Sequence, residues 1–172
     1  MRLIAIAVLT TIFVIPNSAL GQTRRRSTSR QSTTAAAAQK TAQVRTAGAV
    51  RVADQIKHLT TFTYLLGSIN SGIAQVDEEI RRNQASPTMV ESNKASKAKV
   101  RASIQGFREI LDKLEIDFRT TPELQPYYIK LAGVAAGAAT AEEQAAANQF
   151  DAAGRSLIKV IGRLTDVLLV MR

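Results

Sequence analysis

Residues able to carry out chemistry are scarce in this 172-residue chain. It contains no cysteine and one histidine, His58, which excludes thiolate nucleophiles, disulfides, iron–sulfur clusters and most zinc sites. No glutamate takes the Glu-x-x-His spacing of carboxylate di-metal bundles. Five of the 14 acids instead precede a base by four residues, the spacing of solvated helix ion pairs. These pairs are Asp77–Arg81, Glu78–Arg82, Glu109–Lys113, Glu115–Arg119 and Asp151–Arg155. The sequence therefore predicts no catalytic, metal or cofactor site.

Basic residues form one pattern that surface composition alone does not explain. Lys94, Arg101 and Arg108 lie seven residues apart and flank the apolar seam of a predicted helix. In an antiparallel hairpin Lys94 could meet Asp77, whereas Arg101 and Arg108 would find no acid on the first helix. Two interpretations of this stripe stay open. It is a row of solvated side chains whose stems lie along the core, or it is an anion-binding face.

The first 21 residues have the composition of a targeting segment. Met-Arg is followed by the 13-residue run LIAIAVLTTIFVI and then by PNSALG. A short basic start, an apolar run and small residues before the cleavage site predict a secretory signal peptide cleaved after Gly21. An uncleaved membrane anchor is the alternative, although this run is shorter than the roughly 20 residues that a span needs.

Residues 22–42 are rich in Ser, Thr, Arg and Ala and predict a disordered basic arm. No acid occurs between residues 22 and 45. From residue 46 onward the chain has 16 basic and 14 acidic residues, a balance of +2, so the net charge of +9 belongs mainly to the N-terminal segment. The candidate anion-binding residues are therefore Arg24, Arg25, Arg26 and Arg30 of the arm, together with Lys94, Arg101 and Arg108.

The remaining residues, 43–172, follow helical periodicity and contain no alternating strand pattern. Helices are expected at about 43–82, 87–118, 124–147 and 150–171. Gly67 and Gly72 could mark a turn in the first helix, but the apolar register continues through them and favours one helix. Apolar residues spaced three and four apart give this helix a coiled-coil-like seam: Val52, Leu59, Phe62, Leu66, Ile69, Ile73, Val76 and Ile80. The seam predicted for the second helix is Val90, Val100, Ile104, Phe107, Leu111, Leu114 and Phe118. The seam predicted for the last helix is Phe150, Ala153, Leu157, Ile161, Leu164, Leu168 and Met171.

The turns between the later helices are less sharply defined. Ser86-Pro87 is a typical helix start, with Ser as the N-cap and Pro in the first position. The turn before the last helix could lie at Thr140, which has capping-box spacing to Glu143, or at Asn148, which balances the helix lengths. Four helices joined by short loops predict an all-α, antiparallel, up-down-up-down four-helix bundle with a long coiled-coil-like first hairpin.

These features favour an exported, non-catalytic helical bundle that acts through protein–protein contacts in a bacterial cell envelope, in the periplasm or as a secreted protein. The expected partner is a protein of unknown identity, with no cofactor and no small-molecule substrate. The alternative is an anion-binding envelope protein whose arm and stripe hold lipid headgroups, an acidic polymer or nucleic acid by salt-dependent attraction.

Overall fold

The computed structural model describes the backbone from Arg26 to Arg172 and the side chains from Ala35 onward. The predicted signal peptide, residues 1–21, and residues 22–25 of the predicted arm lie outside the described residues. By its contacts the chain divides between Ala37 and Ala38. Residues 26–37 are helical, and the compact unit is Ala38–Arg172.

The described chain is helical and contains no strand, which confirms the all-α class and the helical bundle. Its helices are α1 (Arg26–Arg81), α2 (Pro87–Thr120), α3 (Gln125–Leu131), α4 (Val134–Ala146) and α5 (Phe150–Val170). α1 begins 17 residues before the predicted start at residue 43. It includes most of the segment predicted as the arm, and the alanines at 35–38 have the highest helix propensity of any residue.

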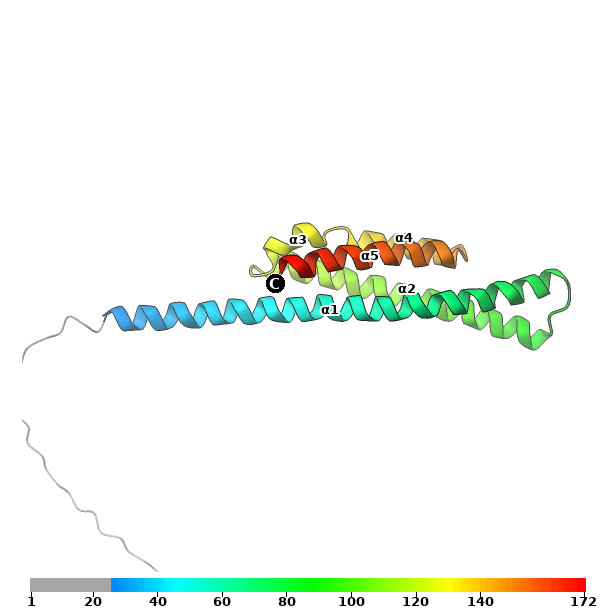
Figure 1. Ribbon diagram of the computed structural model, residues 1–172, viewed down its shortest axis with the longest axis horizontal. Helices are drawn as coiled ribbons and strands as arrows, with labels where there is room; N and C mark the ends of the chain where they lie inside the picture. The colour runs from blue at the N-terminus through cyan, green and yellow to red at the C-terminus, as the bar shows by residue number, and fades with distance from the viewer. Residues whose placement is uncertain (1–25) are drawn as a thin grey trace, which may run out of the picture. The chain divides into compact units, whose positions relative to one another are not determined.

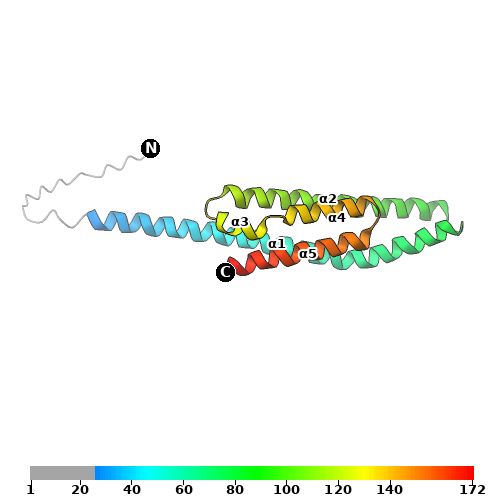
Figure 2. The ribbon, with the colours of Figure 1, turned by 90° about the horizontal axis from the view of Figure 1, so that it is seen from above.

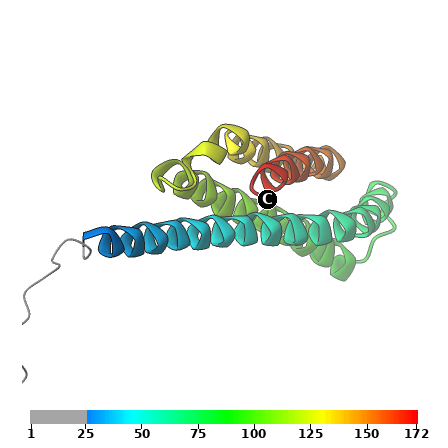
Figure 3. The ribbon, with the colours of Figure 1, turned by 60° about the vertical axis from the view of Figure 1, so that its left-hand side comes forward.

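Within the compact unit, each long helix has two long neighbours. α4 packs against α2 and α5, and α3 packs against the same two helices. α1 contacts α2 through the rings of Phe62 and Phe107, whose centroids are 5.1 Å apart, and lies near α5, where Leu66 faces Gly154. Figures 1 and 2 show α2 alongside α1 and α5 alongside α4. Figure 3 shows α4 and α5 together on one side of the α1–α2 pair.

α1 is continuous through Gly67 and Gly72, as the apolar register predicts. Its buried apolar residues are spaced seven apart, at Val52, Leu59, Leu66 and Ile73. Ile69, also predicted for the seam, is 39% exposed. The heptad spacing keeps one narrow stripe of the helix against its partners, the geometry of a coiled-coil seam.

α2 starts as the sequence predicts. Ser86 has extended backbone angles, and its hydroxyl oxygen accepts a hydrogen bond from the amide of Met89 at 3.3 Å. Pro87 occupies the first turn, where it removes no helical hydrogen bond. The buried apolar residues of α2 are Val100, Ile104, Leu111, Leu114 and Phe118, all predicted for its seam. Val90, also predicted for that seam, is 40% exposed.

The helix predicted over 124–147 is two helices, because the chain turns at Gly133. This residue has φ of +88°, a left-handed conformation that glycine adopts without the steric cost of a side chain. α3 ends before it, with the amide of Ala132 donating to the carbonyl of Tyr128. The amide of Ala135 in the first turn of α4 donates to Glu115 Oε1 of α2 at 2.8 Å. A carboxylate from a neighbouring helix therefore caps α4.

The turn before α5 lies at residues 147–149, so the alternative at Asn148 is correct and the one at Thr140 is not. Asn148 has φ of +60°, which asparagine tolerates better than most residues. The buried stripe of α5 contains Val160 and Val167, whereas the predicted Ile161 and Leu168 are half-buried. Each pair is a doublet of apolar neighbours, so spacing alone cannot select between them.

Gly137 allows α4 and α5 to pack closely, and this contact gives a first prediction. A Cβ on Gly137 would lie 2.8 Å from Cγ2 of Val160, a stiff β-branched side chain. Gly137→Ala is expected to destabilise the protein by about 1–2 kcal/mol, because overpacking outweighs the gain in helix propensity. Gly162→Ala is the control: its Cβ meets nothing within 4 Å, so about 0.5–1 kcal/mol of stabilisation is expected. Denaturant melts measure both, and stabilisation by Gly137→Ala would contradict the close contact.

Candidate functional site

Among the described residues, no group of three or more His, Cys, Asp or Glu side chains is placed to hold a metal ion. None of the helices in this part of the chain is long and apolar enough to cross a membrane. His58 is exposed. Asp54, four residues before it in the sequence, forms an ion pair with Lys57 at 3.5 Å.

Of the five predicted ion pairs along helices, only Glu78–Arg82 forms, with Oε1 and Nε 2.8 Å apart. The other four are wrong, and in three of them a contact with another helix takes the acid: Asp77, Glu115 and Asp151. Glu115 caps α4 and is not available to Arg119. Arg81, the predicted partner of Asp77, binds Glu78. Asp151 accepts from the Asn70 amide of α1 at 2.7 Å. A charged side chain near a helix–helix boundary can reach the neighbouring helix as easily as its own.

The predicted basic stripe on α2 faces α4 at two of its three positions. Arg108 Nη1 lies 3.0 Å from Glu142 of α4, and this hydrogen bond, with the charge of that carboxylate, raises the pKa of the Arg108 guanidinium. Arg101 Nη2 donates to Asn148 Oδ1 at 2.7 Å. Lys94 is exposed and does not pair with Asp77; Lys97 takes that place. Arg24 and Arg25 lie outside the described residues, as do the side chains of Arg26 and Arg30.

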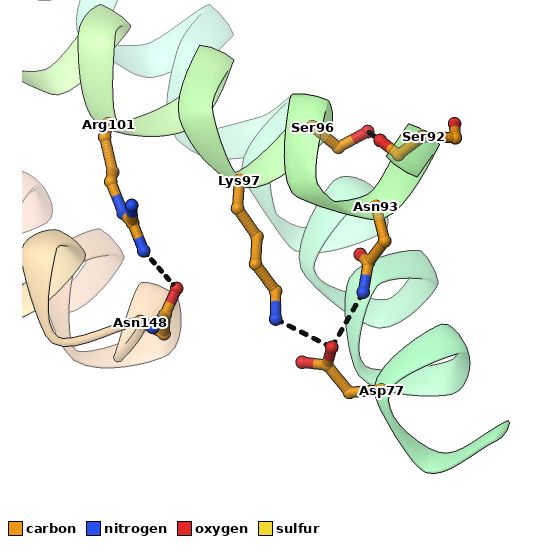
Figure 4. Close-up of polar contacts among 7 residues, drawn as sticks. All are labelled: Asp77, Ser92, Asn93, Ser96, Lys97, Arg101 and Asn148. Atoms are coloured by element: carbon orange, nitrogen blue, oxygen red, sulfur yellow. Dashed lines mark hydrogen bonds and ion pairs between the residues drawn. The ribbon is translucent and has the colours of Figure 1, made fainter. Parts of the chain in front are cut away.

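Polar side chains replace the apolar seam toward the loop that joins α1 and α2. Asp77 Oδ1 of α1 accepts from Lys97 Nζ and from Asn93 Nδ2 of α2, each at 2.7 Å. Figure 4 shows Lys97 and Asn93 converging on this carboxylate, while Arg101 reaches separately toward Asn148. The carboxylate therefore joins the two helices through one ionic and one amide hydrogen bond.

Asn93 is the buried polar residue of this network, with 5% of its surface exposed. Its amide nitrogen is used by Asp77, but its Oδ1 is buried and has no hydrogen-bond partner. Figure 4 shows that oxygen turned away from Asp77. An unsatisfied buried acceptor costs about 1–3 kcal/mol, so its presence at this position calls for an explanation.

Asn93 lines an open groove of about 360 Å³ between α1 and α2, which we call the hairpin groove. The groove combines apolar side chains with small and polar ones. Met89 at its edge is 36% exposed, and Ile69 is exposed to a similar extent. The lining residues are Ile69, Gly72, Ile73, Val76, Met89, Ser92, Asn93 and Ser96. The groove thus offers apolar contact area, and Asn93 in its wall holds a buried acceptor that has no partner.

A second groove, of about 460 Å³, lies where α1 meets the turn between α4 and α5. It is polar, and its two carboxylates are already engaged. Asp77 binds Lys97 and Asn93, and Asp151 accepts from Asn70. Its carboxylates are therefore already held by contacts within the chain.

Sequence reasoning missed Asn93 and Lys97 because the predicted seam was built from apolar residues only. Both nevertheless lie seven residues before seam positions, Asn93 before Val100 and Lys97 before Ile104. Extending the heptad through polar residues would have placed both at the interface with α1. Comparisons with known protein families, curated proteins and solved structures found no match.

Proposed function

We propose that this chain is an exported, non-catalytic helical bundle that binds another protein through the hairpin groove. The observation that carries the proposal is the buried, unpartnered Oδ1 of Asn93 in a groove with apolar walls. A protein can supply both an apolar side chain and the missing N–H or O–H donor. Binding would then recover the cost of leaving this acceptor unsatisfied.

The partner segment best suited to this groove is an amphipathic helix. Such a helix lies with its apolar face in the groove between two others and presents anchors every three or four residues. Gly72, Ser92 and Ser96 are small and allow the backbone of a third helix to come close, while Ile69 and Met89 give it apolar contacts. One hydroxyl or amide donor on the same face would pair with Oδ1 of Asn93, which is itself buried, after the Asn93 side chain turns toward the groove.

The setting of this activity belongs to the same proposal. The apolar run at residues 3–15, followed by Pro16 and a small-residue exit, supports export to a bacterial periplasm or the medium; the minority alternative is an N-terminal anchor. The short connections at residues 82–86 and 147–149 support an up-down-up-down antiparallel order of the long helices. The absence of cysteine and the single histidine support a non-catalytic role.

Anion binding by the arm and the α2 stripe is the weaker alternative. Arg101 binds Asn148 in the turn after α4, and Arg108 binds Glu142 of α4, so binding an anion there would require these contacts to break. Arginines of the arm remain candidates as predicted from the sequence.

The proposal predicts a site-specific adduct in cells that naturally produce the full chain. A photocrosslinking amino acid at Ser92, inside the groove, is expected to capture one discrete partner. The same probe at Ala98, exposed on α2 outside the groove, should not. Gly72→Arg fills the groove and is expected to reduce the Ser92 adduct by about tenfold or more, because a helix can no longer approach.

Gly67→Arg is the matched control for Gly72→Arg. Both glycines are exposed on α1, and a Cβ at either position meets nothing within 4 Å, so both variants should fold. Gly67→Arg is expected to keep the adduct. Equal yields from the Ser92 and Ala98 probes, or equal losses in the two arginine variants, would reject the hairpin groove as the binding surface.

A further inference from the structure

The outer boundary of α4 and α5 holds a groove of about 360 Å³ whose charged side chains are all basic. Lys159 and Arg163 of α5 lie one helical turn apart along it, and no acid is among its lining residues. The opposite side is formed by small residues, including Gly133, Gly137 and Ala136. This groove belongs neither to the hairpin groove nor to the predicted stripe on α2.

The two cations have no ion pair within 4 Å among the described residues. Like charges four residues apart on a helix repel each other and cost a few tenths of a kcal/mol. Arg155 stands one turn before Lys159 and adds a third positive charge to this face of α5. The three cations thus gather along one face of α5, and none of them forms an ion pair within 4 Å among the described residues.

The side chain of Arg163 extends across the groove from α5 toward Gly133. Nη1 of Arg163 lies 2.7 Å from the position that a Cβ would take on Gly133. The guanidinium therefore covers the turn between α3 and α4, in space left open by the missing side chain. A group held between Arg163 and Lys159 would contact two charged side chains that leave α5 about one helical turn apart.

We propose that this α4–α5 groove binds a phosphate group. A phosphate offers several acceptor oxygens to an arginine and a lysine, and charge-assisted hydrogen bonds of this kind are the strongest that side chains form. The hydroxyls lining the groove donate elsewhere, Thr140 to the carbonyl of Ala136 and Ser156 to Gln144 Oε1. The phosphate is therefore recognised by charge, and its binding weakens as salt increases.

The test titrates inorganic phosphate into the full chain, held in neutral detergent micelles because of its apolar N-terminal run, and follows amide signals by NMR. Chloride at equal ionic strength is the reference. Saturable shifts are expected at residues 133–140 and 156–163. Lys159→Gln/Arg163→Gln is expected to weaken binding by about tenfold or more, since two charge-assisted contacts are lost.

Lys113→Gln/Arg119→Gln is the matched control, because it removes the same charge from exposed residues of α2 that form no ion pair within 4 Å among the described residues. It is expected to change binding less than about twofold. Equal weakening in both double variants would show a general charge effect and overturn the proposal, as would saturation that neither variant alters. Thermal melts without phosphate check that both variants fold.

A second arm identifies the source of the phosphate group. Micelles doped with phosphatidylglycerol are compared with micelles doped with phosphatidylcholine, and inorganic phosphate is added as a competitor. Competition at the α4–α5 signals assigns the groove to anionic lipid headgroups. Shifts with inorganic phosphate alone assign it to soluble phosphate. If neither probe shifts these signals in a way that depends on Lys159 and Arg163, the site does not exist.

Discussion

Replacing Leu164 by alanine is expected to lower the free energy of unfolding by about 2–5 kcal/mol. Leu164 is fully buried on α5, in the central hydrophobic cluster to which α1, α2 and α4 all contribute. Its truncation removes buried methylene groups and leaves a cavity that rigid helix packing closes only in part. Leu66→Ala on α1 should show a loss in the same range, because Leu66 is 3% exposed in the same cluster.

The control lies on the same helix. Ile158 is 58% exposed, so Ile158→Ala is expected to cost less than about 1 kcal/mol, the range of ordinary surface changes. Glu109→Ala and Asp151→Ala, which affect only exposed polar contacts, should also stay below about 1 kcal/mol. Denaturant melts with unchanged slopes give the comparison. Similar losses for Leu164→Ala and Ile158→Ala would mean that the faces of α5 are wrongly assigned.

The sequence predicts the apolar seams well because heptad spacing is a local property. Leu59, Leu66 and Ile104 are buried as expected, and Gly67 and Gly72 do not interrupt α1. Each of these results depends on residues within a few turns of each other. The buried face of such a helix can be predicted without knowing the partner helix, because any partner would cover the same apolar stripe.

The break at Gly133 and the capping by Glu115 depend on contacts that local spacing does not contain. Gly133 lies in a run of small residues, where alanine favours helix and glycine permits either outcome. What ends α3 there is a backbone turn, and the carboxylate that caps α4 comes 20 residues earlier in the sequence. The same competition displaced the expected partners of Asp77 and Asp151. Polar contacts are decided by the tertiary arrangement, so sequence spacing predicts them poorly.

Asn93 has one property that the sequence predicts and one that it does not. Its heptad position follows from local spacing, whereas the lack of a hydrogen-bond partner for its Oδ1 depends on the tertiary structure. Leucine has the same branching as asparagine, with two terminal carbons in place of Oδ1 and Nδ2. Asn93→Leu is therefore expected to change the free energy of unfolding by less than about 1 kcal/mol. The lost hydrogen bond to Asp77 is offset by removal of an unsatisfied buried acceptor, and Asp77 keeps Lys97 at 2.7 Å.

The same substitution should have a large effect on binding. A partner donor buried against the introduced leucine side chain would be left unpaired at a cost of about 1–3 kcal/mol, which corresponds to about 5- to 150-fold weaker binding. The yield of the Ser92 adduct measures this loss. Asn70→Leu is the control, because it makes the same chemical change on α1 at a residue outside the hairpin groove that donates to Asp151. It should leave the adduct intact.

A buried asparagine at a seam position can instead fix the register of two helices. That role makes a different prediction: Asn93→Leu would then broaden the unfolding transition or produce more than one species, whatever happens to binding. A cooperative melt near the original midpoint together with a lost adduct would assign Oδ1 to a partner. An unaltered adduct in Asn93→Leu would remove the observation on which the proposed function rests, because the unsatisfied acceptor would then have no part in recognition.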